Sequence, residues 1–266
     1  MIKSAFKHVA KLVLRPGYRR RCSILNSLQK VPRYTHATTD LLGPELTLVD
    51  APSIVPMYEE IFEHEIYRFR SCSENPLIID CGANVGLSVL YFKRLYPLCR
   101  IIAFEPDVQI FRALKHNVES FGVTDVEAVN KAVWVEDGKI NFYVEGSDAG
   151  SLINSTSATG NVSVDAVRLK SFLSKSVELL KMDIEGAETE VLQDCREELA
   201  NVQNIFVEYH SFPDQPQALP LLLNILDGSG FRIHIQTPAV VSPQPLNQRH
   251  THNGMDMLLN VFGYRE

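Results

Sequence analysis

The chain has 266 residues and a formal net charge of −6, and 45% of its residues are hydrophobic. This size allows a full α/β core, and no apolar run approaches the ~20 residues that a membrane-spanning helix needs. The charge is uneven, because residues 1–35 hold nine Lys or Arg and no acid, which leaves 17 basic against 32 acidic residues in the rest. So acidic a body argues against nucleic-acid binding, which needs clustered basic side chains.

The five cysteines favour a reducing compartment, and we expect a cytoplasmic protein. Their number is odd, and their spacing matches neither a zinc site nor a disulfide framework. They are Cys22, Cys72, Cys81, Cys99 and Cys195.

Residues 1–50 are expected to form a basic N-terminal extension, and residues 51–266 the main domain. Apolar residues near the start, from Ile2 to Val13, follow a helical spacing with lysines on other faces. Two interpretations stay open: weak contact of residues 1–21 with a membrane surface, or a segment that packs on the body or frays. The extension also contains a short strand candidate, Leu46–Val49.

The remaining elements alternate between strand and helix patterns. In chain order we expect helix 53–70, strand 77–81, helix 85–96, strand 100–104, helix 107–121 capped by Asp107, strand 126–130, a hairpin over 133–145 turning at Asp137-Gly138, a polar loop over 146–161, strand 177–182, helix 187–199, strand 204–209, helix 216–228, strand 231–236 and strand 255–262. This order predicts an α/β fold with a mostly parallel sheet, helices on both faces and an antiparallel last strand.

The most informative segment is Leu77–Gly86, a buried strand followed by a glycine-containing turn and a helix start. It reads Asp-x-Gly-x-Asn-x-Gly from Asp80 to Gly86, and a second apolar strand ends at Glu105. A carboxylate at that second strand end is placed to accept the ribose hydroxyls of a nucleoside. Asp80 would repel a pyrophosphate but not a sulfonium with an ammonium group, so S-adenosylmethionine fits better than NAD.

Polar residues lie at the carboxyl ends of most of the predicted strands. They are Asp80, Glu105, Asn130, Asp183 with Glu185, and Glu208 with His210. Ligands of such sheets bind at the carboxyl ends of the strands, so we expect these side chains to converge on one crevice.

With these residues in place, the sequence resembles the FkbM family of S-adenosylmethionine-dependent methyltransferases over roughly residues 54–262. The matching segments are Glu60-Ile61-Phe62 with Tyr67, Ile79–Gly86, Ala103–Pro106, Leu180–Glu188 and Val207–His210. The resemblance implies a class I methyltransferase fold, Rossmann-like, with seven strands of which the sixth and seventh are antiparallel. It also implies methylation of an oxygen, usually a hydroxyl of a sugar, glycan or natural product.

The expected cofactor contacts follow from both arguments. Gly82, Ala83, Asn84 and Gly86 would hold the methionine portion, with Asp80 near its ammonium, Glu105 at the ribose, and Asn130 and Ala132 beside the adenine.

The chemistry requires a residue that removes the acceptor's proton. Asp183 and His210 are the candidates, with Glu185 and Glu208 close by, and we expect Asp183, Glu185 and His210 to be catalytic. Alternatively, Asp183 caps the following helix, His210 caps its turn, or the acids and His210 together bind a divalent metal.

Two acceptor contacts are expected, Glu208 and Ser151. Ser151 lies with Ser147 and Asp148 in the polar loop, which is otherwise a solvated hairpin end. The leading hypothesis is therefore an O-methyltransferase. The alternatives are an inactive cofactor-binding partner module and an N-methyltransferase acting on an amine.

Overall fold

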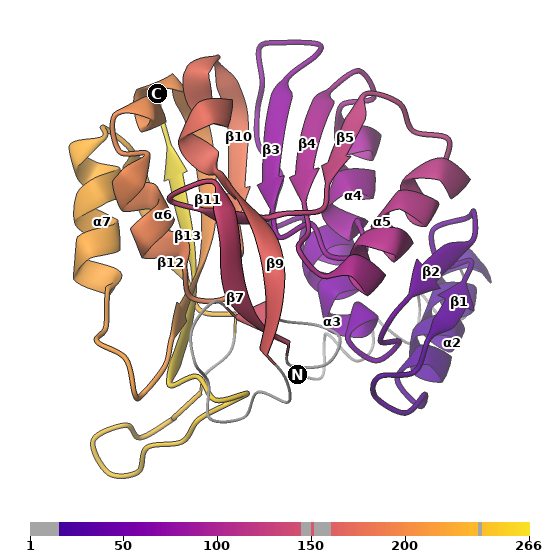
Figure 1. Cartoon of the computed structure of the whole chain (residues 1–266). Helices are drawn as coiled ribbons and strands as arrows, with labels where there is room; N and C mark the ends of the chain where they lie inside the picture. The colour runs from indigo at the N-terminus through magenta and orange to yellow at the C-terminus, as the bar shows by residue number, and fades with distance from the viewer. Residues whose placement is uncertain (1–15, 145–149, 152–160, 239–240) are drawn as a thin grey trace.

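A seven-stranded sheet forms the centre of the molecule (Figure 1). The computed structural model describes residues 16–144, 150–151, 161–238 and 241–266. The strands lie in the order β12-β13-β11-β10-β3-β4-β5. Their bounds are β3 Leu77–Cys81, β4 Arg100–Phe104, β5 Val126–Val129, β10 Val177–Met182, β11 Val202–Ser211, β12 Arg232–Gln236 and β13 Met257–Tyr264.

The last strand is inserted between its neighbours and runs against them. β13 pairs antiparallel with both β11 and β12, whereas the pairs from β11 to β5 are parallel. The predicted antiparallel closing pair is therefore confirmed.

Successive side chains of the central strands enter two cores on opposite faces of the sheet. Ile78 packs into one core and Ile79 into the other, and both are fully buried. Such two-sided burial explains the unbroken apolar run. α4 (Leu87–Leu95) and α5 (Val108–Ser120) contribute to the first core, and α6 (Glu188–Asp194) and α7 (Leu219–Gly228) to the second. The carboxylate of Asp107 caps α5 as predicted, accepting from the N–H groups of residues 109 and 110.

The connection from β5 to β10 is a second, four-stranded sheet in place of a helix. Its order is β6-β9-β7-β8, with bounds β6 Ala132–Trp134, β7 Gly138–Val144, β8 Gly150–Ser151 and β9 Asn161–Arg168. The predicted hairpin over 133–145 is wrong, because β9 lies between β6 and β7 and pairs with both. Asp137 bonds to the N–H of Arg168 at the end of β9. The period-two pattern of Asn161–Arg168 was the missed signal.

The predicted helix over 53–70 is also wrong beyond Glu63. α3 spans Ile54–Tyr58 and continues as a π-helix over Glu59–Glu63. Glu65 then takes a positive φ of 53°, which ends the helical path. The apolar residues after it still pack on the core, so their spacing reflects burial without a helix. Likewise, α6 ends at Asp194, short of the predicted 199. Short 3₁₀ helices span Leu169–Ser174 and Glu198–Asn201.

The described part of the N-terminal segment packs on the first core. It consists of α2 (Pro16–Leu28), β1 (Ala37–Thr39) and β2 (Leu46–Leu48), the last two paired antiparallel. Leu46 and Leu48 are fully buried. The side chain of Asn117, on α5, bonds to both backbone groups of Thr47 and to the carbonyl of Val85.

Two expectations about the N-terminus stay predictions, because they fall wholly or largely outside the described residues. They are the early amphipathic pattern up to Val13 and a surface contact through residues 1–21. The domain boundary at residue 50 stays a prediction too. Among the described residues, no helix combines the length and the apolar character needed to span a membrane.

Candidate active site

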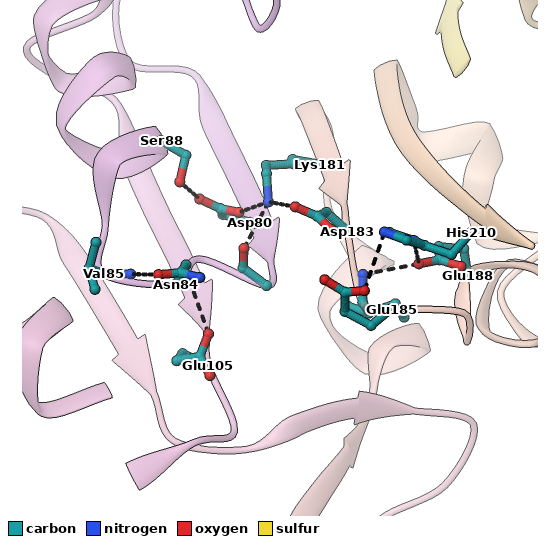
Figure 2. Close-up of polar contacts among 12 residues, drawn as sticks. Asp80, Asn84, Val85, Ser88, Glu105, Lys181, Asp183, Glu185, Glu188 and His210 are labelled. Carbon is teal, nitrogen blue, oxygen red and sulfur yellow. Dashed lines mark hydrogen bonds and ion pairs between the residues drawn. The ribbon is translucent and has the colours of Figure 1, made fainter. Parts of the chain in front are cut away.

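The turn after β3 has no backbone donor left for a phosphate. The N–H groups of Gly82 and Ala83 bond to the carbonyl of Phe104, and that of Gly86 bonds to Ala83. The two between them bond to carboxylate and amide side chains (Figure 2). A pyrophosphate needs such donors, and residues 82–86 offer it none, so a ligand without phosphate fits this turn better.

Gly82 is fixed at its position by the neighbouring strand. Its φ is +83°, and a Cβ atom there would lie 1.9 Å from the carbonyl oxygen of Asp183. Only glycine allows the ends of β3 and β10 to approach this closely. The turn and the end of β10 therefore form one site.

Glu105 follows β4 and is almost completely buried. One carboxylate oxygen accepts the N–H of Asn84 at 3.0 Å, and the other accepts that of Asp107 at 2.9 Å. Burial raises the pKa of Glu105 to about 8. The carboxyl is thus held in place beside the turn, and its contact with a ribose stays a prediction.

Asp80 lies in a buried ion pair with Lys181. The Nζ atom of Lys181 is 3.2 Å from Asp80 Oδ1, and Ser88 donates to Oδ2 at 2.5 Å. Burial disfavours the ammonium, but the carboxylates of Asp80 and Asp183 outweigh it and raise the pKa of Lys181 well above its usual value. The charge of Asp80 is therefore already balanced within the protein, and its contact with a cofactor ammonium stays a prediction.

Asn130 and Ala132 lie on the chain that leaves β5. The amide of Asn130 donates to the carbonyls of Glu105 and Pro106, which ties the ends of β4 and β5 together. Ala132 is buried in β6. Asn130 also lines an open groove along α5 with six residues of that helix: Val108, Phe111, Arg112, Lys115, His116 and Glu119.

A second cluster joins three of the predicted catalytic residues at the ends of β10 and β11. One ligand atom from each of Asp183, Glu185 and His210 lies within 4.8 Å of the others. His210 Nε2 is 3.4 Å from a carboxylate oxygen of Glu185. The two carboxylate side chains remain about one quarter exposed, while the His210 side chain is 4% exposed. The cluster is therefore open toward the acids and closed behind the ring.

Glu188 holds this arrangement in place. It is 1% exposed, and its carboxylate accepts the N–H groups of Ile184 and Gly186 and contacts His210 Nδ1 at 3.0 Å (Figure 2). Burial disfavours a charged ring, but Glu185 and Glu188 outweigh it and raise the pKa of His210 well above its usual value. The two carboxylates therefore favour the protonated ring, and the partly exposed Asp183 and Glu185 are better placed than His210 to accept a proton.

Two more acids face the cluster. Burial, and then the charge of Asp183, raise the pKa of Glu208 to about 8. The same two causes raise the pKa of Glu60, which lies on the π-helix. The predicted convergence is confirmed for Asp183, Glu185 and His210, and Glu208 lies near enough to Asp183 for their charges to interact.

The predicted contact at Ser151 falls mostly outside what is described. The backbone of Ser151 belongs to β8, but its side chain, and all of Ser147 and Asp148, lie outside the described residues. Ser151 stays a prediction.

Lys181, Glu188 and Glu60 are the site residues that sequence reasoning did not single out. All three lie in the segments that carry the family resemblance. Lys181 was concealed within an apolar strand, and its role depends on its register opposite Asp80 in the sheet. Single-strand patterns do not give that pairing.

Comparison with family models gives a match over residues 80–266 to the methyltransferase FkbM domain. This range covers most of the chain and every strand of the central sheet except the start of β3.

Two curated relatives and one solved structure illustrate the similarity. Methyltransferase 1 of Beauveria bassiana is 29% identical over 213 residues, which cover 70% of this chain and 84% of that protein. The 2-O-methyltransferase NoeI of Sinorhizobium fredii is 28% identical over 169 residues, covering 55% and 68%. The structure of M. jannaschii TYW2 in complex with AdoMet matches with a TM-score of 0.51 at 13% identity, covering 88% of this chain and 87% of that one. That likeness supports the fold alone, which is the predicted class I methyltransferase fold.

Proposed function

The chain belongs to the FkbM family of methyltransferases, and from that premise we propose that it transfers a methyl group from S-adenosylmethionine to a hydroxyl of a sugar, glycan or natural-product acceptor. Membership makes it a methyltransferase of an S-adenosylmethionine-dependent family. The cofactor of this chain, the oxygen acceptor and the residues that act on it are the proposal.

The turn of residues 82–86, which we call the cofactor turn, fits S-adenosylmethionine. Its ribose hydroxyls are donors, and Glu105 offers a buried, fixed acceptor. It carries no phosphate, and the N–H groups of the turn are already used within the protein. When bound, the cofactor supplies a methyl group that its sulfonium has already activated.

Lys181 is the observation that carries the proposal. Its ammonium donates to the carbonyl of Gly82 at 2.8 Å and lies 3.4 Å from Asp183 Oδ2. The side chain of Lys181 thus links the cofactor turn to Asp183 in the cluster at the ends of β10 and β11. An acceptor bound against Asp183 lies next to the cofactor turn, as in-line transfer requires.

The second cluster would position the acceptor and take up its proton. Asp183 and Glu185 are partly exposed and ionisable, so they can accept hydrogen bonds from neighbouring hydroxyls and remove the proton from the one that is methylated. The name of the relative NoeI specifies a 2-O-methyltransferase, which supports oxygen as the acceptor atom here.

The test is binding followed by transfer. Calorimetry is expected to show binding of S-adenosylhomocysteine and none of NAD. An isotope-labelled methyl group is then offered to glycans, glycolipids, hydroxylated metabolites and amines, and is expected on oxygen. Label on nitrogen would make the chain an N-methyltransferase. Cofactor binding without transfer to any acceptor class would favour the inactive partner module.

A further inference from the structure

We infer that Asp183, Glu185 and His210 form a binding site for one divalent first-row cation, such as Mn²⁺, at the acceptor end of the active site. This inference rests on the proposed function only for the location of the acceptor, and its test is independent of methyl transfer.

The first argument is the donor set and its spacing. Two carboxylates and one imidazole suit cations of the Mn²⁺ to Zn²⁺ series. Ligands bound ~2.1 Å from a shared ion lie at most about 4.2 Å apart, and the three donor atoms here lie within 4.8 Å of one another. Small side-chain rotations that move the donor atoms about 0.6 Å closer together would bring them to coordination distance.

The second argument is the support behind the ring. Glu188, which is outside the three ligands, contacts His210 Nδ1 at 3.0 Å and is itself fixed by two backbone N–H groups. A carboxylate on one ring nitrogen orients the other toward the metal in many metalloproteins. Here the other nitrogen, Nε2, faces Glu185 (Figure 2).

The third argument is the charge of the surroundings. Three carboxylates, Asp183, Glu185 and Glu188, gather around the ring of His210. Lys181 lies 3.4 Å from Asp183 Oδ2, and a bound metal ion would take the place of the proton on His210 Nε2. Lys181 is occupied by Asp80 and Gly82. A divalent cation would offset the surplus that Glu185 and Asp183 create at a partly exposed position.

The proposed role follows from the position. The exposed sides of Asp183 and Glu185 leave room for ligands from solvent or from an acceptor. A cation there would coordinate the acceptor hydroxyl, lower its pKa and orient it toward the cofactor turn. Vicinal hydroxyls, as in a sugar, would occupy two coordination positions at once.

The experiment uses the full chain, stripped with EDTA and titrated with Mn²⁺ under electron paramagnetic resonance. We expect one bound Mn²⁺ per chain. Glu185→Gln and His210→Gln should weaken its affinity at least tenfold, and Glu188→Gln by roughly 10–100-fold as a positioning residue. Glu178→Gln is the matched control, because Glu178 lies near the start of β10, the strand that Asp183 follows, and it should keep wild-type affinity. Melting curves and S-adenosylhomocysteine binding establish that each variant is folded.

The outcomes separate the two proposals. Absence of bound Mn²⁺, Mg²⁺ and Zn²⁺ at millimolar concentration, or equal affinity in all the variants, would overturn the metal site. If EDTA-treated protein still methylates a hydroxyl acceptor at the full rate, the proposed function stands and the metal role does not. Stoichiometric Mn²⁺ binding without any adenosyl-ligand binding would overturn the proposed function and leave the metal site in place.

Discussion

The two halves of the active site are built on opposite principles. At the ends of β3 and β4, each carboxylate already has its partners: Asp80 has Lys181 and Ser88, and Glu105 has two backbone N–H groups. At the ends of β10 and β11, carboxylates gather with too few cations. In the first half, each carboxylate is already compensated by partners within the protein. The second half has an excess of negative charge, which a bound ligand or cation would compensate.

The largest expected effect tests the carboxylate cluster at the ends of β10 and β11. Asp183→Asn keeps the shape and removes one charge, so turnover should fall by ~10²–10⁴ while the affinity for S-adenosylhomocysteine changes little. Steady-state kinetics and calorimetry measure the two quantities. Asp194→Asn is the control, since Asp194 pairs with Arg168 at the far end of α6. Normal turnover with a lower melting temperature would instead make Asp183 a purely structural residue. The alternative that it caps the following helix is wrong, because the N-cap of α6 is Ala187 and Asp183 contacts Lys181.

The next effect tests the buried ion pair at the end of β3. Lys181→Met leaves Asp80 buried without its ammonium, and the free energy of unfolding should fall by ~3–5 kcal/mol in urea denaturation. Lys93→Met is the matched control, because the buried ammonium of Lys93 donates to the carbonyl of Cys99, and it should cost only ~1–3 kcal/mol.

A double variant sharpens this comparison. Adding Asp80→Asn to Lys181→Met should recover part of the loss, because the unpaired charge is gone. Equal losses for the two lysine variants, with no recovery, would show that the pair does not stabilise the fold.

The smallest effect is a pH dependence at Glu105. Burial holds its pKa at about 8, so the free protein carries a proton there at neutral pH. Ribose hydroxyls donate best to the ionised form, and the affinity for S-adenosylhomocysteine should rise up to about tenfold per unit between pH 6 and 8. Calorimetry should show this slope in the wild type and none in Glu105→Gln. Glu127→Gln, at an exposed pair with Arg100, should keep it.

The stability of the fold should change with the opposite sign. A carboxyl whose pKa is raised on folding contributes stability that is complete below its unfolded value of about 4.5 and is lost as the pH rises through about 8. The wild type should therefore lose more stability than Glu105→Gln over that range. Identical pH profiles for both proteins would refute the raised pKa.

The residues at the ends of β3 and β4 could be predicted from the sequence because each lies in or next to its own strand. Asp80 and Gly82 stand at the end of one plain apolar run, and Glu105 follows another. For the cluster at the ends of β10 and β11, the sequence predicted only that the strand ends converge. The contact of Glu188 with His210, the reach of Lys181 across the sheet and the approach of Glu60 on a π-helix depend on register and on a helical irregularity. The hairpin over 133–145 failed for the same reason, since the partner strand β9 comes later in the chain.

Asn117 has a consequence for how the chain is made. Its side chain holds Thr47 of β2, 70 residues earlier in the sequence, and Val85 of the cofactor turn. At a synthesis rate of 5–20 residues per second, roughly 4–14 seconds separate the emergence of Thr47 from that of Asn117. During that interval β2 and the cofactor turn lack their shared anchor. The N-terminal hairpin and the turn can therefore share this anchor only after α5 has been synthesised.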